Sequence, residues 1–462
     1  MHAGIPLSRT LPVLVIGAGP VGLSAAAQLV AAGETPLVVE AGERVAASVR
    51  EWGHVRLFST WHYNVDPSAV ALLEQTGWQR PAEDEYPTGS ELVERYLEPL
   101  AAHPKIAEHL RLGTRVTAVS RRGFDVMKSD GREASTFVAL LRDAAGREDM
   151  VEAKAVIDAS GTWATPNPLG ASGLPALGEA GVRDRIHYGI PDVLGGDRDR
   201  YAGRRTLVVG SGDSAFNTIL DLTDLARAVP QTRVVWAVRR PTIGLLFGGG
   251  EDDALVERGR LGARVRSLVD EGLLELVLGF QIDELADAAG GVTVRSGERE
   301  LEPFDRIVAA TGARPDLSLL RELRLDLDEG VEAPRALAPL IDPNFHSCGT
   351  VRPHGAVELG HPDPDVFIVG VKSYGRAPTF LLLTGYEQVR SVIAAIQGDW
   401  EAARDVHLEL PETGVCSRDL LDESPQATGG CCASAIEPAD ETAAGVGTLA
   451  VAAPARTSGC CR

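Results

Sequence analysis

The sequence predicts an α/β fold with two Rossmann-like, dinucleotide-binding domains, and three observations support this. An apolar run is followed by the pattern Gly-x-Gly-x-x-Gly, starting at Gly17, and then by a helical segment of small residues. A second apolar run precedes Gly-x-Gly-x-x-Ala, starting at Gly210, and another helical segment. Each half also has a later apolar strand ending in Ser-Gly or Thr-Gly, within Ala153–Trp163 and Phe304–Asp316. This order predicts that the second domain is inserted into the first.

The first glycine pattern has the residues that a dinucleotide requires. Gly17 allows a tight turn, Gly19 lets the backbone approach a pyrophosphate, and Gly22 lets the following helix pack closely on the sheet. That helix starts near Gly19, with Pro20 next, and directs its N–H groups and positive end at the phosphates. Glu40 lies about 20 residues further on, where an acid binds ribose hydroxyls and repels a 2′-phosphate. FAD or NAD therefore fits here, and NADP does not.

The second glycine pattern differs from the first in the residues that end its second strand. Gly210, Gly212 and Ser214 form the phosphate-binding turn, and the strand that corresponds to the one before Glu40 ends on Arg239 and Arg240. Two guanidinium groups at this place can bind a 2′-phosphate, which favours NADPH over NADH. The alternative, that both are ordinary surface arginines, stays open for this preference.

Composition and charge narrow the class of partner. The chain has 462 residues, ordinary hydrophobic content and a formal net charge of -20, which repels nucleic acid and anionic lipid. It has no apolar run long enough to span a membrane and no secretory signal pattern at residues 1–12. We expect a cytoplasmic enzyme that acts on a small molecule. The oligomeric state stays open, and a homodimer is compatible with the sequence.

The intervening segments predict further elements. Pro87–His103 predicts a helix that Thr88 or Ser90 caps, with apolar residues at helical spacing. Alternating strands are expected around residues 115–119 and 136–141. Near the end, a helix that begins near Thr379 would direct its N-terminus at the flavin pyrimidine and stabilise negative charge on reduced flavin.

These elements predict four regions. The regions are a first FAD-binding part, an NADPH-binding domain with its linker, a second FAD-binding part, and a largely disordered tail. Their predicted bounds are residues 1–165, 166–303, 304–400 and 401–462.

All six cysteines lie in the last quarter of the chain. Four of them form adjacent pairs, Cys431-Cys432 and Cys460-Cys461, which suit soft metal or metalloid ions better than a disulfide framework. We expect these pairs to capture a metalloid and deliver it to the flavin. A tail with chance cysteines is the alternative. Cys348 lies near His346 and His354, which suggests an activated thiolate; a small buried cysteine is the equal alternative.

The order of these motifs resembles the flavin-containing monooxygenases and their relatives over residues 11–399. Within that group, HSCGTVRPHG, KSYGRAPTFLLLTGYEQVRS and LPETGVCS are similar to flavoprotein monooxygenases of bacterial arsenic-resistance operons. The chain departs from the monooxygenase pattern F-x-G-x-x-x-H, because Gly181 and Arg183 replace the Phe and Gly while His187 remains. The usual Gly-Asp near the end reads Gly370-Val371.

The motifs support three functional hypotheses. In the first, hydride passes from NADPH to FAD, and reduced flavin with O2 transfers one oxygen atom to a soft nucleophile, such as trivalent arsenic or an organoarsenical. In the second, the flavin passes electrons to a disulfide or to a thiol-bound metal or metalloid, although no Cys-x-x-Cys is present. A sensor or carrier that binds cofactor without turnover is the third. The candidate catalytic residues are Cys348, His346 and His187. Further cofactor-binding candidates are Arg56, Ser59, Gly161, Thr311, Gly312, Gly370 and Thr379.

Overall fold

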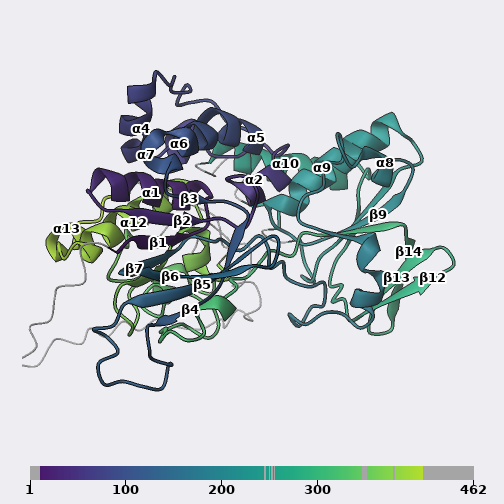
Figure 1. Ribbon diagram of the computed structural model, residues 1–462. Coiled ribbons are helices and arrows are strands. Elements are labelled where there is room, and N and C mark those ends of the chain that lie inside the picture. The colour runs from purple at the N-terminus through teal and green to yellow at the C-terminus, as the bar shows by residue number, and fades with distance from the viewer. Residues whose placement is uncertain are drawn as a thin grey trace, which may run out of the picture. The chain divides into compact units, whose positions relative to one another are not determined.

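The computed structural model describes residues 11–243, 246–248, 250, 253, 255–345, 351–377 and 380–408. Two parallel sheets lie within these ranges, and one strand in each leads directly into a glycine pattern (Figure 1). The predicted α/β class with two Rossmann-like units is confirmed.

The first sheet has the strand order β16-β7-β1-β2-β3, and all its neighbours are parallel. Its strands are β1 (Val13–Ile16), β2 (Pro36–Val39), β3 (Leu110–Arg111), β7 (Ala155–Asp158) and β16 (Val366–Ile368). Every side chain of β1 is buried, because both faces of the sheet are covered. Val13 and Val15 join a core with the helices, whereas Leu14 and Ile16 join a core with an antiparallel sheet.

Helices cover one face of this first sheet, and α1 and α12 are the longest of them (Figure 1). The elements of this layer are α1 (Pro20–Ala31), α2 (Ala47–Glu51), α3 (Trp61–Asn64), α4 (Pro67–Leu73), η1 (Glu74–Thr76), α5 (Gly89–Leu92), η2 (Val93–Leu97), α6 (Glu98–Ala102), α7 (Pro104–Ala107), α11 (Ala338–Ile341), α12 (Leu382–Ile396) and α13 (Trp400–Arg404). The helix predicted over Pro87–His103 is present as α5, η2 and α6. Thr88, one of the two expected caps, begins it and also exchanges hydrogen bonds with Glu91.

An antiparallel sheet covers the other face of the first sheet. It consists of β4 (Thr114–Arg121), β5 (Phe137–Asp143) and β6 (Glu148–Ala153). The first two confirm the predicted alternating strands, and their inward side chains are Val116, Val119, Phe137, Ala139 and Leu141. The short helical turns η5 (Ser318–Leu320) and η6 (Gly370–Tyr374) complete this half.

The second unit repeats the same design. Its parallel sheet has the order β11-β10-β9-β15-β8, with α9 and α10 on one face and an antiparallel sheet on the other. The elements are η3 (Glu179–Arg185), β8 (Ile186–Tyr188), α8 (Arg198–Tyr201), β9 (Arg205–Val209), α9 (Asp213–Ala228), β10 (Arg233–Ala237), α10 (Val256–Asp270), β11 (Glu275–Val277), β12 (Glu284–Ala288), β13 (Gly291–Ser296), β14 (Arg299–Phe304) and β15 (Arg306–Ala309). The strands β9, β10 and β15 therefore correspond to β1, β2 and β7.

This correspondence corrects two expected boundaries. β15 pairs with β9 and β8, so the second sheet continues past residue 303, where the sequence-based boundary was placed. β8 lies in the expected linker, the Pro- and Gly-rich residues 166–203, and forms the edge of that sheet. The expected tail also begins too early, because α13 packs on α12 and the Ser391 hydroxyl donates to the Ala403 carbonyl at 2.5 Å.

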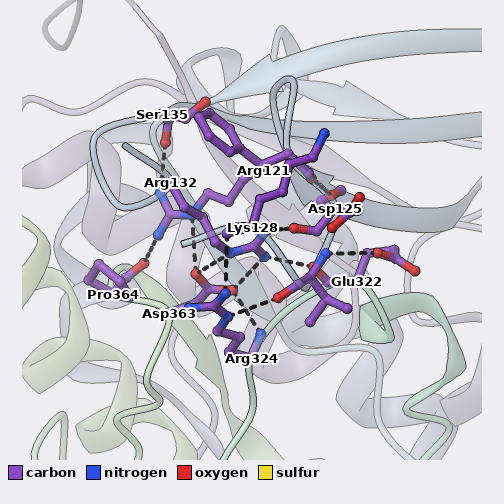
Figure 2. A network of polar contacts seen from close by, with 12 residues as sticks. Arg121, Asp125, Lys128, Arg132, Ser135, Glu322, Arg324, Asp363 and Pro364 are labelled. Carbon is purple, nitrogen blue, oxygen red and sulfur yellow. Dashed lines mark hydrogen bonds and ion pairs between the residues drawn. The ribbon is translucent and has the colours of Figure 1, made fainter. Parts of the chain in front are cut away.

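A buried polar network, which we call the Asp363 cluster, ties the antiparallel sheet to more distant segments (Figure 2). The Asp363 carboxylate accepts hydrogen bonds from Arg132 at 2.9 and 3.2 Å and from the Arg324 backbone N–H at 2.7 Å. The Arg121 guanidinium lies 3.6 Å from the same carboxylate and donates to the Pro364 and Ser135 carbonyls. Asp363, Arg132 and Arg121 are all buried, so the carboxylate balances guanidinium charge inside the protein.

Candidate functional site

The first glycine pattern lies at the carboxyl end of β1, beside the end of β7. Gly17 has φ +97°, and a Cβ atom there would lie 2.9 Å from the Ala159 carbonyl oxygen. A Cβ atom at Gly22 would lie 1.9 Å from the Gly17 carbonyl oxygen, so α1 packs directly on the turn. At Gly19 an added Cβ atom would meet nothing within 4 Å, and no side chain caps α1, which starts at Pro20. This open surface with backbone donors fits the FAD pyrophosphate.

Glu40 lies at the end of β2, beside this turn. Its two carboxylate oxygens accept hydrogen bonds from the backbone N–H groups of Ala18 and Gly42, each at 2.7 Å. These bonds fix the carboxylate next to the glycine pattern. Since each carboxylate oxygen can accept a second hydrogen bond, the group can also bind ribose hydroxyls. The position fits the predicted role.

A buried ion pair lies where β7 and β16 end. The Lys372 ammonium is 2.7 Å from the Asp158 carboxylate and 2.9 Å from the Ser160 hydroxyl, and both charged side chains are fully buried. Gly161 and Gly370 adjoin this pair and both have positive φ, +71° and +69°. Sequence reasoning named the two glycines but missed the ion pair.

The second glycine pattern repeats this geometry. Gly210 has φ +130°, and a Cβ atom there would lie 2.1 Å from the Ala310 carbonyl oxygen. Gly212 again faces open space, and α9 starts behind it at Asp213 without a side-chain cap. The two phosphate-binding turns are therefore built alike, each against the segment that follows the neighbouring strand.

A cavity of about 690 Å³ opens in front of this second turn. Both halves of the chain line it, because Phe58 and Arg376 join residues of the second unit. The predicted cofactor-binding residues that line it are Gly210, Gly212, Ser214, Arg239, Arg240, Thr311 and Gly312. This lining fits NADP(H), since it combines guanidinium groups with the N-terminus of a helix at the turn.

The two segments that connect the units run side by side. The Asn167 N–H donates to the Gly312 carbonyl at 2.9 Å, and the Arg314 N–H donates to the Thr165 carbonyl at 3.1 Å. The Thr311 hydroxyl donates to the Asn167 carbonyl at 2.7 Å. Thr311 therefore shapes the cavity wall while its hydroxyl holds the two connections together.

Two of the predicted flavin-pocket residues have partners of their own. The Arg56 guanidinium donates to the Tyr86 carbonyl at 2.6 Å, and the Ser59 hydroxyl donates to the Asn64 side chain at 3.1 Å. Neither lines the NADP(H) cavity, whereas Phe58 between them does. Their contact with the flavin stays a prediction, and no sequence signal distinguished Phe58 from neighbouring aromatics.

His187 lies on the edge strand β8 and does not line the NADP(H) cavity. Burial lowers the pKa of its imidazole, and the nearby positive groups of Arg200, His54 and Arg183 lower it further, while Asp197 opposes them. His187 is therefore neutral at pH 7. Its predicted catalytic role has no support from its position relative to the cavity.

Several predicted site residues lie outside the described ranges: His346, Cys348, Thr379, Cys431, Cys432, Cys460 and Cys461. The helix expected near Thr379 begins at Leu382, with Leu381 before its first turn. Among the residues that the structure describes, no group of His, Cys, Asp and Glu side chains could hold a metal ion.

Comparison with known proteins agrees with this geometry. A model of the pyridine nucleotide-disulphide oxidoreductase family matches residues 11–352. The chain belongs to this family. It is 25% identical to a ferredoxin–NADP reductase of Rhodospirillum rubrum over 405 residues, which cover 87% of this chain and 95% of that protein. Identity to a ferredoxin–NADP reductase of Ralstonia pickettii is 27% over 323 residues, covering 66% and 70%.

Solved structures show the same fold. Bacillithiol disulfide reductase Bdr of Bacillus cereus has a TM-score of 0.61 at 19% identity, over 84% of this chain and 99% of that one. The cadaverine monooxygenase DfoA of Erwinia amylovora has a TM-score of 0.59 at 15% identity, over 91% and 99%. A flavin-containing monooxygenase of Stenotrophomonas maltophilia has a TM-score of 0.52 at 20% identity, over 84% and 98%. Both reductases and oxygenases thus share this fold.

Family and geometry together identify a flavin-dependent oxidoreductase that uses FAD and NAD(P)H. The resemblance to flavoproteins with two dinucleotide sites is confirmed at this level. In the part of the chain that the structure describes, no helix is long and apolar enough to cross a bilayer.

Proposed function

We propose that this protein is an NADPH-dependent FAD monooxygenase that transfers one oxygen atom to a soft nucleophile. The observation that carries the proposal is the position of the cysteines. None lies before residue 348, and none occurs in the described ranges, so no dithiol there can take electrons from the flavin. The acceptor then comes from outside the described part of the chain, and O2 is the simplest such acceptor.

The chain's own residues bind and orient the two cofactors. The turn at Gly17 and the Glu40 carboxylate would hold FAD, while the turn at Gly210 with Arg239 and Arg240 would hold NADPH. FAD, when bound, accepts hydride from NADPH and passes the electrons onward. Precise positioning of the two rings and control of water access are the protein's main contributions.

Trivalent arsenic or an organoarsenical is the proposed oxygen acceptor. The motifs that resemble the arsenic-operon monooxygenases support this assignment, as do the adjacent cysteines near the end of the sequence. Vicinal thiolates are good ligands for soft ions and would raise the local concentration of a thiophilic metalloid. Oxygen transfer would convert the trivalent element into a pentavalent, less thiol-reactive product.

A coupling experiment tests the oxygenase proposal. The FAD-loaded protein is mixed with NADPH in oxygenated buffer, and NADPH loss, hydrogen peroxide release and the oxidised arsenic product are measured with and without arsenite. We expect arsenite to suppress peroxide release and to yield one pentavalent product for each NADPH consumed. Unchanged peroxide release without an oxidised product would contradict the proposal.

A reductase is the second candidate, and the ferredoxin–NADP reductases are the observation that favours it. Electrons would then leave the flavin for an iron–sulfur protein, a disulfide or a thiol-bound metalloid. The formal net charge of -20 would disfavour an acidic protein partner. NADPH-dependent reduction of such acceptors under nitrogen, combined with failure of the coupling experiment, would favour this candidate.

A further inference from the structure

The NADP(H) cavity is lined by four arginines that differ in their surroundings: Arg239, Arg240, Arg258 and Arg376. The first two follow β10, where a 2′-phosphate is expected. Arg258 is buried and forms a bidentate pair with the Asp253 carboxylate, at 2.7 and 2.8 Å, so a carboxylate balances its charge.

Arg376 differs from the other three in origin and in having no side-chain partner in the described part of the chain. It belongs to the segment between η6 and α12, which is part of the FAD-binding half, yet it lines the cavity of the second unit. Its side chain is exposed and makes no hydrogen bond or ion pair with any residue that the structure describes. The guanidinium therefore has its donors available for a ligand.

The backbone that carries Arg376 is held tightly. Gly375 has φ +56°, and a Cβ atom there would lie 2.1 Å from the Val331 carbonyl oxygen. That same carbonyl accepts a hydrogen bond from the Arg376 N–H at 2.7 Å, and the Ala377 N–H donates to the Tyr374 carbonyl at 2.9 Å. The segment is thus fixed before a ligand binds, and only the side chain of Arg376 must become ordered.

The two phosphate-binding turns differ in the residue that begins the following helix. Pro20 begins α1, whereas an acid, Asp213, begins α9. A carboxylate in the first turn reduces the positive potential with which a helix N-terminus attracts phosphate. A guanidinium that lines the same cavity adds positive charge for a phosphate ligand.

We propose that Arg376 binds the pyrophosphate of NADP(H) from the FAD-binding half of the chain. The 2′-phosphate is left to Arg239 and Arg240, and the backbone donors at Gly212 face the pyrophosphate from the other side. Bound NADP(H) thereby links the two dinucleotide-binding halves. This role concerns nucleotide binding alone and holds whichever acceptor takes the electrons.

Calorimetric titration of the oxidised, FAD-loaded protein with NADP+, NAD+ and adenosine 2′-monophosphate tests this. The last probe has the 2′-phosphate but no pyrophosphate. For Arg376→Ala we expect the Kd of NADP+ and of NAD+ to rise by similar factors, about 10- to 100-fold, as for loss of a charge-assisted hydrogen bond. The Kd of adenosine 2′-monophosphate should not change, and Arg376→Lys should recover part of the lost affinity.

Two further variants distinguish pyrophosphate binding by Arg376 from 2′-phosphate binding and from a general loss of positive charge. Arg239→Ala should weaken adenosine 2′-monophosphate and NADP+ while leaving NAD+ unchanged. Arg321→Ala removes an exposed arginine outside the cavity and should change none of the three constants. FAD content and Tm show whether each variant is folded. An unchanged Kd of NADP+ in a folded Arg376→Ala protein, or weakened binding of adenosine 2′-monophosphate, would overturn the proposal.

Discussion

At the residue scale, Gly19 and Gly212 occupy equivalent positions in the two phosphate-binding turns, and both face open space. Neither has a positive φ, and an added Cβ atom at either would meet no protein atom within 4 Å. Alanine at either position should therefore change the stability of the cofactor-free protein little. Its methyl group would instead occupy the space through which the pyrophosphate approaches the protein backbone.

We predict that the two alanine variants separate the two cofactors. Gly19→Ala should lower FAD content at least tenfold, while Gly212→Ala should keep FAD and raise the Kd of NADP+ by about 10-fold or more. Flavin absorbance after purification and titration with NADP+ measure these effects. Gly22→Ala is the opposite control, because its Cβ atom would lie 1.9 Å from the Gly17 carbonyl and should prevent folding.

The surroundings of His361 indicate that the stability of the folded protein depends on pH. Its Nδ1 accepts a hydrogen bond from the Asp326 N–H at 3.3 Å, and its Nε2 is buried without a partner in the described part. Burial lowers the pKa of this imidazole to about 4 from 6.5. The unfolded chain therefore takes up a proton between pH 6.5 and 4 while the folded chain does not, so the folded state loses stability as pH falls.

The expected loss from His361 is about 3 kcal/mol between pH 7 and pH 4. Urea unfolding of the FAD-loaded protein at several pH values measures it. His361→Gln should flatten this part of the pH dependence, whereas His407→Gln, which changes an exposed histidine, should not. Equal slopes for the wild type and His361→Gln would show that His361 is not responsible.

Sequence reasoning located the residues whose role depends on spacing along the chain. Gly17, Gly19 and Glu40 lie within one strand–helix–strand unit, and their predicted arrangement matches the structure. Arg376 and Phe58 were missed as cavity residues, because only the tertiary fold brings them to a turn 150 or more residues away in sequence (about 160 from Arg376 to Gly212). Arginine and phenylalanine carry no local pattern that would reveal this.

At the scale of elements, the Asp363 cluster holds β4 and the segment after it against the approach to β16 (Figure 2). Burial alone would raise the pKa of Asp363, but hydrogen bonds from Arg132 and the Arg324 backbone and the Arg121 charge lower it below 3.8. The carboxylate is therefore charged throughout the neutral range. Its stabilising effect is lost only as the pH falls below about 4.

Asp363→Asn should destabilise the protein by about 3–5 kcal/mol at pH 7, because it removes the carboxylate that pairs with two buried guanidinium groups. Asp149→Asn breaks the exposed pair with Arg111 and should cost less than about 1 kcal/mol. Urea unfolding at constant ionic strength compares them. Similar losses in both variants would mean that the cluster acts through packing alone.

Strands and helices were easier to predict than the limits of the units. Periodicity identified β4, β5 and the helix capped by Thr88, because each depends on local sequence. β15 was assigned to the wrong unit, since a short apolar strand carries no information about the sheet that it joins. Strand pairing over a hundred residues decides that, as between β15 and β9.

At the scale of the whole chain, α13 fixes where a truncation is tolerated. Arg390 donates to the Ala402 carbonyl, and the His407 N–H donates to Glu387 at 2.9 Å, so residues up to this point support α12. A chain that ends after Leu408 should keep FAD content, Tm and reduction by NADPH. A chain that ends at residue 400 removes α13 and should have a lower Tm.

The protein that ends after Leu408 also tests the expected function of the cysteine pairs. Removal of residues 409–462 deletes the four paired cysteines, Cys431, Cys432, Cys460 and Cys461, together with Cys416. Binding of arsenite to the oxidised protein should weaken by about tenfold or more if these thiols capture it. Replacement of the four by serine in the full chain separates the thiols from the segment itself. Unchanged arsenite binding in both proteins would remove the tail from the mechanism.

The two connections between the units lie side by side, which affects how such proteins can evolve. The chain leaves the first unit at Thr165 and returns at Arg314, and these residues are hydrogen-bonded neighbours. An inserted domain whose entry and exit points adjoin imposes little restraint on its host. The NADP(H)-binding unit can therefore be replaced as a whole during evolution. The preference for NADPH or NADH can then change while the fold of the FAD-binding half stays the same.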